Sequence, residues 1–456
     1  MAEYDLLVRG GTVVSGNNAV RGDVAVSSGR VAAVLPAETA ATAATVIDAA
    51  GRLVLPGLID SHVHFRTPGL CHKENWVNGS MAAAAGGITT VIDMPNTQPP
   101  LLTSRDAEAK HRMVAGASLV DYQFHAGVVP ERMAELRTFS GRETVSVKVF
   151  LSGHHTAPNV VRSSDDLERL FEFATETGQV LLFHAEDEAV FELLDAYRGE
   201  PRTCSDYEAH RPRTAAIVAV AKLIELARRH GARTHVLHVS SREEVDLLIA
   251  AATAGIPITF EVTGHHLTFT NADISRLGSR IRLRPAIREQ ADQDRLWQAL
   301  LDGHVTTVGS DHAPHTIEEK GRSVPDAPPG LPGVQELFPT LYTGLRKQCP
   351  HASASDLASV AVRVLAEGPA RLFGLAHRKG AIRPGLDADL VVFDPEHQWT
   401  LTAGDIRSRC GWSAYTGQAF SGRVECTVRR GEIVYAWSPS GVQFGAPTGH
   451  WLVLGC

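Results

Sequence analysis

Between about residue 55 and residue 375 the chain alternates eight times between a short apolar, strand-like run and a helix-like segment. Strands that alternate with helices pair in parallel, and eight such units are enough to close a barrel. The runs span residues 58–65, 89–94, 122–129, 146–151, 180–184, 234–239, 257–262 and 306–310. The sequence therefore predicts an α/β fold, a (β/α)8 TIM barrel, whose active site lies at the C-terminal ends of the strands.

Both ends of the chain have a different texture. Short strand-like runs broken by glycines fill the first 50 or so residues and return after Gly374. They predict a small β-sandwich domain built from both chain termini. We expect residues 1–54 and 376–456 to form the sandwich and its C-terminal tail, with residues 55–375 forming the barrel. The tail carries Phe444, Trp451 and Leu452, which favour packing on a surface or on a partner subunit.

Composition excludes several classes of protein. The net charge of −7 comes from mixed signs without a long basic run, which argues against nucleic acid as a partner. The six cysteines show no CxxC spacing and predict free thiols in a reducing cytoplasm. No apolar run reaches the roughly 20 residues of a membrane span, so we expect no membrane partner.

Histidine, lysine and aspartate side chains stand at the ends of five strand-like runs. Residues i and i+2 of a strand point the same way, so His62 and His64 can bind one ion together. The complete set is His62, His64, Lys148, His184, His238 and Asp311. Imidazole and carboxylate ligands at neighbouring strand ends are typical of a two-metal hydrolase.

The segments around these residues resemble the cyclic-amide branch of the amidohydrolase superfamily, which contains dihydroorotases, hydantoinases (dihydropyrimidinases) and allantoinases. The His-x-His-x-Arg block at 62–66 and the Asp-His-Ala-Pro-His block at 311–315, followed by Lys320, are similar to the two dihydroorotase signatures. The segment Pro-Pro-Gly-Leu-Pro-Gly at 328–333 also resembles dihydroorotases. Allantoinases typically have Ser-Pro after the late Asp-His, and hydantoinases usually lack the arginine of the first block.

This resemblance implies two divalent ions per chain, expected to be Zn²⁺. His62, His64 and Asp311 would bind one ion, His184 and His238 the other, and Lys148, carboxylated by CO2, would bridge them. A hydroxide shared by the ions would attack the ring carbonyl, and Asp311, as the catalytic residue, would carry its proton to the leaving nitrogen. Other divalent metals suit the same nitrogen and oxygen ligands, so the native metal stays open.

The resemblance also implies a pocket for a free carboxylate on a small-molecule substrate. Arg66, Asn96 and His315 match the dihydroorotase residues that hold this group, and an arginine suits it because the guanidinium donates two parallel hydrogen bonds. Arg284 opens an Arg-Pro-Ala segment where many dihydroorotases have Asn-Pro-Pro. An arginine there resembles the dihydroorotase domain of the animal multifunctional pyrimidine enzyme and would add a second cation.

The leading hypothesis is a dihydroorotase-like enzyme that interconverts dihydroorotate and N-carbamoyl-aspartate in pyrimidine biosynthesis. One alternative is hydrolysis of another cyclic amide or imide, such as a hydantoin, allantoin, a dihydropyrimidine or a specialised-metabolism ring. The other is a catalytically silent homologue that serves as a scaffold; it is disfavoured because all six ligands are present.

Several properties stay open at this level. His154 and His155 either recognise a substrate edge or are loop residues without a role, and His265 and His266 are expected to be structural rather than metal-binding. We expect a homo-oligomer, but the sequence fixes neither the number of subunits nor whether a transcarbamoylase partner is bound.

Overall fold

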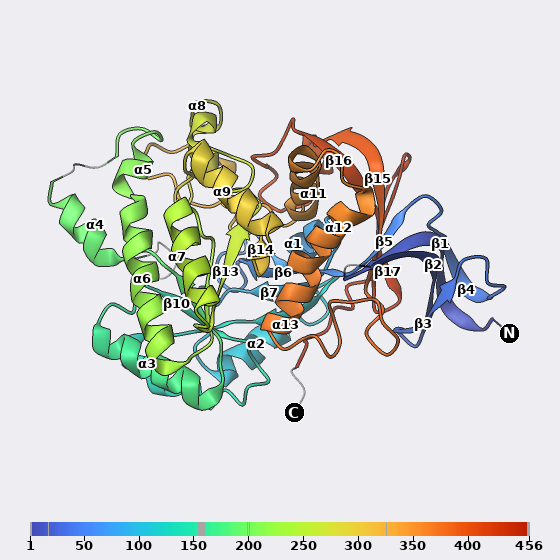
Figure 1. The fold of residues 1–456 in the computed structure, drawn as a ribbon, viewed down its shortest axis with the longest axis horizontal. Helices are drawn as coiled ribbons and strands as arrows, with labels where there is room; N and C mark the ends of the chain where they lie inside the picture. Colours follow the sequence, from blue (N-terminus) through green and yellow to red (C-terminus); the bar gives the residue numbers. More distant parts are fainter. Residues whose placement is uncertain are drawn as a thin grey trace.

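The structure, a computed structural model, describes residues 2–16, 18–153, 160–197, 199, 201–324 and 326–453. Its centre is a barrel of parallel strands, and a β-rich region formed by both chain ends lies beside it (Figure 1). In Figure 1 the N-terminal strands, in blue, lie at the far right of the view, beyond the orange and red C-terminal strands. None of the described helices combines the length and the apolar surface needed to cross a lipid bilayer.

Eight strand positions, counted over the described residues, form the barrel wall. They are β6 (Leu58–Val63), β7 (Ile88–Asp93), β8 (Asp121–Phe124) with its continuation β9 (Ala126–Gly127), β10 (Val147–Phe150), β11 (Leu181–His184), β12 (Thr234–Val236), β13 (Ile258–Thr263) and β14 (Thr307–Gly309). Neighbours pair in parallel, and a bridge between Val63 and His312 joins the first strand to the last. The predicted barrel is confirmed, and its strands are buried on both faces as expected for a parallel sheet covered by helices.

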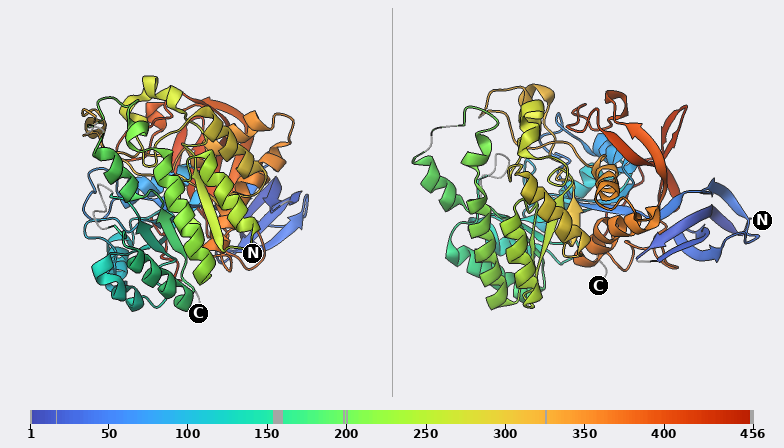
Figure 2. Two further views of the ribbon diagram at one scale, coloured as in Figure 1. Left: turned by 60° about the vertical axis from the view of Figure 1, so that its left-hand side comes forward. Right: turned by 45° about the horizontal axis from the view of Figure 1, so that its top comes forward.

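Helices cover the outside of the barrel, as the two views in Figure 2 show. The helices are α1 (Trp76–Ala85), α2 (Ser104–Val114), α3 (Ser164–Thr177), α4 (Glu188–Asp195), α5 (Tyr207–His210), α6 (Arg213–His230), α7 (Arg242–Thr253), α8 (Ile274–Leu277), α9 (Gln290–Leu301), α10 (Ile317–Lys320), α11 (Leu337–Gln348), α12 (Ala354–Val362) and α13 (Gly368–Leu372). Local signals set their ends: Ser241 and Glu244 form a capping box that starts α7. Helices α6 and α7 are two of the helix-like segments that the sequence places between the strand-like runs.

The two chain ends share one hydrogen-bonded sheet. Its strands are β1 (Tyr4–Ser15), β2 (Asn18–Ser27), β3 (Arg30–Pro36), β4 (Ala43–Asp48), β5 (Leu53–Pro56), β15 (Leu390–Thr400), β16 (Ala419–Arg429), β17 (Glu432–Ser438) and β18 (Gly441–Phe444). The ends meet where β15 pairs antiparallel with β5. Helices α1, α11 and α12 contact this sheet, and β16 also contacts the barrel strand β7. The β-rich region built from both termini is confirmed, while its predicted boundaries stay predictions.

The C-terminal tail packs on the barrel of its own chain. The backbone N–H of Tyr122 in β8 donates to the carbonyl of His450 at 2.9 Å, and the N–H of Leu452 donates to the carbonyl of Tyr122 at 2.8 Å. The Trp451 ring stacks on His111 of α2, with ring centroids 4.7 Å apart. The tail therefore extends the wall of the barrel beside β8 instead of hanging free.

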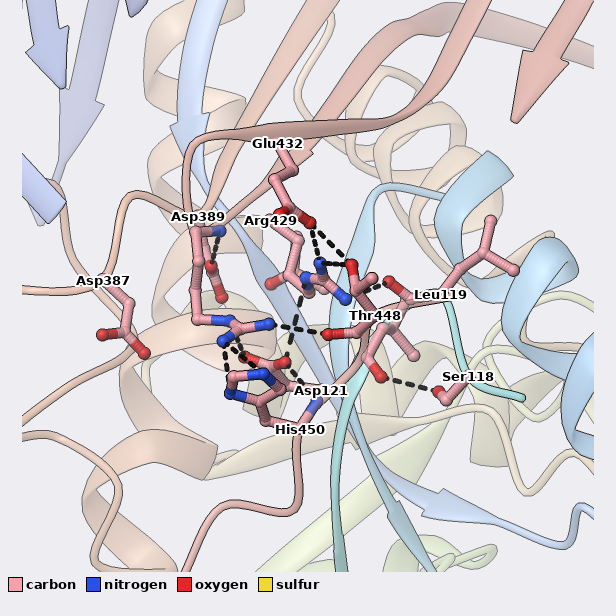
Figure 3. A network of polar contacts seen from close by, with 12 residues as sticks. Ser118, Leu119, Asp121, Asp387, Asp389, Arg429, Glu432, Thr448 and His450 are labelled. Atoms are coloured by element: carbon pink, nitrogen blue, oxygen red, sulfur yellow. Dashed lines mark hydrogen bonds and ion pairs between the residues drawn. The ribbon is translucent and has the colours of Figure 1, made fainter. Parts of the chain in front are cut away.

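A buried network of charged side chains holds tail, barrel and sheet together at the N-terminal end of β8 (Figure 3). The Nζ atom of Lys379 lies 2.6 Å from Asp121, 2.7 Å from Asp389 and 3.1 Å from Asp387. Arg430, after β16, lies 3.2 Å from Asp121, which also accepts a backbone hydrogen bond from the tail at 2.8 Å. Buried charges persist only when they are paired, so this network fixes how the three parts meet.

Candidate active site

Two histidines and an aspartate form a compact cluster at the C-terminal end of the barrel. His62 lies in β6, His64 follows this strand directly, and Asp311 follows β14. The Nε2 atoms of His62 and His64 are each 3.2 Å from Oδ1 of Asp311. One ligand atom from each residue lies within 4.8 Å of the other two, which is close enough for all three to share one divalent ion. The structure therefore brings these three predicted ligands together.

Further hydrogen bonds determine which ring nitrogen of each histidine faces this cluster. The Nδ1 atom of His62 lies 2.7 Å from Oε1 of Glu261, and that of His64 lies 2.9 Å from Oδ1 of Asn96. These acceptors place a proton on Nδ1 and leave Nε2 for an ion. Burial alone would lower the pKa of His62, but Glu261 and Asp311 raise it to about 9. An ion must therefore displace a proton from His62.

His184 and His238 form a second group of predicted metal ligands. His184 ends β11, His238 follows β12, and Nδ1 of His184 lies 2.9 Å from Nε2 of His238. The other nitrogen of His184 lies 2.9 Å from Oε2 of Glu186, which accepts a hydrogen bond from Arg211 at 2.5 Å. Burial lowers the pKa of His184 to about 4, so its ring is neutral at pH 7. A neutral ring has the free electron pair that a metal ligand needs.

Lys148 lies in β10, next to the strand that carries His184. It interacts electrostatically with Asp311 and Glu261 and also with His184 and His238. Burial lowers the pKa of Lys148 to about 7. Near neutral pH a large share of this side chain is therefore an uncharged amine, the form that can react with CO2.

These residues fit two divalent ions. The donor atoms are imidazole nitrogens and a carboxylate oxygen, the usual ligands of zinc. Three of the four histidines direct one ring nitrogen to a protein acceptor and leave the other toward the site. Lys148 interacts electrostatically with members of both groups, and its predicted bridging role stays a prediction.

Three residues at the C-terminal end of the barrel, called its mouth below, have a strained backbone. Arg66, His238 and Asp311 have left-handed backbone angles, with φ of 58°, 38° and 42°. Such conformations cost a non-glycine residue on the order of 1–3 kcal/mol and persist only where the surroundings hold them. All three residues were predicted from the sequence to serve the site.

Arg66 is buried beside the cluster without a hydrogen-bond partner. Its exposed fraction is 2%, and none of its three guanidinium nitrogens finds an acceptor in the described part of the chain. Burial lowers its pKa to about 10, which still leaves the group charged at neutral pH. A buried guanidinium with unused donors suits a planar anion such as a carboxylate. Its role in substrate binding stays a prediction.

Asn96 and His315 already have protein partners. Asn96 accepts the hydrogen bond from His64, so it also orients a predicted metal ligand. The ring of His315 is fully buried, with Nδ1 3.1 Å from Nζ of Lys73 and Nε2 3.1 Å from the carbonyl oxygen of Pro329. Both ring nitrogens of His315 are thus engaged, and substrate contacts by Asn96 and His315 stay predictions.

Arg284 is half-buried and donates to the carbonyl of Gly153 at 3.0 Å and to the hydroxyl of Tyr207 at 3.2 Å. It therefore contacts the loop that follows β10, and its contact with a substrate carboxylate stays a prediction. His154 and His155 follow Gly153 directly and lie outside the described residues.

Sequence reasoning missed the acidic residues that contact the predicted metal ligands. Glu261 and Glu186 are fully buried and contact His62 and His184. Two signals were available: Glu261 interrupts an apolar strand run, and Glu186 follows His184 by two residues. Lys320, by contrast, has a structural role, since its Nζ donates to the carbonyls of residues 328 and 330 at 2.8 and 2.9 Å.

Residues 53–434 match the sequence profile of the Amidohydrolase family. The chain belongs to this family. This amidohydrolase is 36% identical to an allantoinase of Streptomyces avermitilis over 443 residues, which cover 96% of each chain. It is also 37% identical to a dihydroorotase of Halobacterium salinarum over 371 residues, 80% of this chain and 82% of that protein.

Solved structures of hydantoinases are also similar to this chain. The amidohydrolase is similar to the L-hydantoinase (dihydropyrimidinase) of Arthrobacter aurescens, with a TM-score of 0.92 and 29% identity over 99% of this chain and 100% of that chain. The D-hydantoinase (dihydropyrimidinase) of a Thermus species follows with a TM-score of 0.86 and 25% identity, covering 98% and 99% of the two chains. These matches confirm the prediction that the chain belongs with the cyclic-amide relatives of the amidohydrolase superfamily. They do not establish the more specific dihydroorotase hypothesis.

Proposed function

We propose that this amidohydrolase opens a cyclic ureide by hydrolysing an amide bond of the ring, with two divalent ions, expected to be zinc, at the mouth of the barrel. The observation that carries the proposal is the convergence of ligand atoms from His62, His64, Asp311, His184 and His238 around buried Lys148. When bound, such a pair of ions polarises the ring carbonyl and lowers the pKa of the attacking water.

The side chains divide the remaining tasks. Lys148, as a carbamate formed with CO2, presents two anionic oxygens where its ammonium form would have offered only a charge and no lone pair. Burial alone would raise the pKa of Asp311, but His62 and His64 hold it well below its usual value, so this carboxylate is ionised. Asp311 then accepts the proton of the attacking water and delivers it to the leaving ring nitrogen.

The first substrate class is a ring of the allantoin or hydantoin type. It is supported by the names of the relatives, among them the allantoinases of Streptomyces avermitilis and of Rubrobacter xylanophilus, the second being 36% identical over 446 residues. A second candidate is dihydroorotate, the substrate class indicated by the sequence motifs. The buried guanidinium of Arg66, with no acceptor among the described residues, favours a ring that carries a carboxylate.

One panel of assays tests both levels of the proposal. The zinc-loaded protein, prepared in bicarbonate, is incubated with allantoin, hydantoin, dihydrouracil and dihydroorotate, and ring opening is followed for each. We expect hydrolysis of at least one ring that depends on added metal; no turnover of any ring contradicts the proposal. A preference for dihydroorotate over dihydrouracil, which lacks the carboxylate, selects the second candidate, and turnover of allantoin or hydantoin selects the first.

A further inference from the structure

The carboxylate of Glu261 contacts one member of each metal-ligand group. Glu261 lies in β13 and its side chain is fully buried. Its Oε1 atom lies 2.7 Å from Nδ1 of His62 and 3.3 Å from the backbone nitrogen of His238. His62 belongs to the group for the first ion and His238 to the pair for the second, so a single oxygen atom links the two groups.

His62 is the cation in direct contact with the Glu261 carboxylate, while Lys148 interacts with Glu261 at longer range. Within the described residues His62 is its one ion-pair partner, and Oε2 of Glu261 has no hydrogen-bond partner. A buried carboxylate is costly unless a positive charge offsets it. A cation at Nε2 of His62 offsets this charge through the ring, and by thermodynamic reciprocity the carboxylate then strengthens cation binding.

Packing holds the carboxylate in this place. A Cβ atom at Gly309 in β14 would lie 2.6 Å from Oε2 of Glu261 and 3.0 Å from Cβ of His62. The glycine therefore leaves the space that Glu261 and His62 occupy. The backbone of His238 is left-handed, with φ of 38°, and its N–H points to Glu261, which helps to hold this strained residue in place.

We propose that Glu261 is a positioning residue that sets the affinity of both ion sites, through the side chain of His62 and the backbone of His238. This inference rests on the proposed two-metal function. Glu186 provides a matched comparison, because it is an equally buried carboxylate that contacts His184 of the second group and pairs with Arg211, but contacts none of the residues predicted to bind the first ion in the described part of the chain. The two glutamates should therefore differ in how many sites they affect.

Zinc titrations of the metal-free protein in bicarbonate, followed by calorimetry, measure this difference. In Glu261→Gln a neutral amide keeps the shape but weakens both hydrogen bonds. We expect its first-site affinity to fall by about 10- to 100-fold and its second-site affinity to fall as well. Glu186→Gln should weaken the second site alone. Titrations of His64→Asn and His184→Asn identify which binding step belongs to which site.

The imidazole N–H signals of the metal-free protein give a readout that is independent of activity. The Nδ1–H proton of His62, hydrogen-bonded to a carboxylate, should resonate far downfield, move upfield in Glu261→Gln and stay in place in Glu186→Gln. If Glu261→Gln does not fold, as judged by circular dichroism, Gly309→Ala displaces the carboxylate without removing its charge and should weaken both sites.

The outcomes distinguish failure of the role proposed for Glu261 from failure of the proposed two-metal function. If the wild type binds two ions and Glu261→Gln, or Gly309→Ala in its place, binds both with unchanged affinity or loses only the first, the coupling role of Glu261 is overturned. If the wild type itself does not bind two ions, the two-metal function is what fails.

Discussion

Two lysines are buried at opposite ends of the barrel, and their pKa values shift in opposite directions. At the C-terminal mouth, burial lowers the pKa of Lys148 to about 7, because Asp311 and Glu261 offset it only in part. At the N-terminal end of β8, burial acts in the same way on Lys379, but Asp121, Asp389 and Asp387 more than compensate and raise its pKa. The number of close carboxylates thus decides whether a buried lysine is a reactive amine or a permanent cation.

The same contrast holds for the surroundings of the two lysines. The C-terminal end of the barrel has unused hydrogen-bond donors, since the buried guanidinium of Arg66 lacks an acceptor in the described residues. The network around Lys379 pairs its cations with carboxylates, of which Asp121, Asp387 and Asp389 are labelled in Figure 3. Changes at the mouth should therefore alter function more than stability, and changes in the network should do the reverse.

The largest effect is expected for Lys148→Ala. Without the bridging group both ions should be lost, and activity should fall by more than the roughly 10⁴-fold that a single acid–base group contributes. Thermal unfolding of the metal-free protein should hardly change, because a buried and partly uncompensated cation is removed. Metal content by mass spectrometry and ring-opening rates measure this, and added short carboxylic acids should restore part of the activity. Full metal content in Lys148→Ala would contradict the bridging role.

Asp311→Asn tests proton transfer at the same end of the barrel, since the amide keeps the shape of the aspartate but cannot accept the proton. We expect a rate loss above the 10²–10⁴-fold typical of an acid–base group, because metal binding also weakens. Stopped-time assays at saturating zinc measure this loss. Near-normal turnover would rule out proton transfer by Asp311.

Lys379→Met should act at the other end of the comparison. Removing this cation leaves three buried carboxylates without their central partner, and breaking a buried ion pair costs about 3–5 kcal/mol. The free energy of unfolding from urea titrations should drop by this amount, while kcat per folded molecule stays the same. Arg228→Met, which removes an exposed ion pair with Glu225, is a control that should change stability by less than about 1 kcal/mol. A variant as stable as the wild type would show that the network does not fasten the tail.

Arg66→Met removes the unpaired cation of the mouth. If the substrate ring carries a carboxylate, two charge-assisted hydrogen bonds of about 1.5–3 kcal/mol each are lost, so the preference for dihydroorotate over dihydrouracil should fall by about 100-fold or more. Metal content should stay unchanged, and the metal-free protein should become no less stable. Comparison of kcat/KM for the two rings decides, and an unchanged ratio would assign Arg66 a structural role.

The smallest effect is a pH dependence of stability. The pKa of Lys148 is about 7 in the folded protein against 10.5 for a free lysine, so the unfolded chain binds more protons between these values. The free energy of unfolding of the metal-free protein in CO2-free buffer should therefore rise with pH in this window, by at most about 1.4 kcal/mol per pH unit from this group. Lys148→Met should reduce the slope measured by urea titration at pH 7 to 10. An equal slope in both proteins would mean that Lys148 is not desolvated.

Much of the fold was predictable because its signals are local. Each of the eight apolar runs coincides with a barrel strand, since a short run of apolar residues is itself the local signal of a buried strand. That the predicted ligands lie near one another was predictable for a related reason: residues at the ends of parallel strands share one end of the barrel. Their role as metal ligands stays a prediction. The pairing of Asn96 with His64 could not be predicted in the same way, because a turn residue after proline has several possible directions.

The sequence alone determined the barrel, the β-rich region from both ends and the donor set at the strand ends, since periodicity and spacing act over a few residues. Only the tertiary structure decided which charges meet. Glu261 contacts His62 across 199 residues of chain, and Lys379 contacts Asp121 across 258. Such pairs form only after the barrel closes, when burial removes water and each charge must find a partner within a few ångströms.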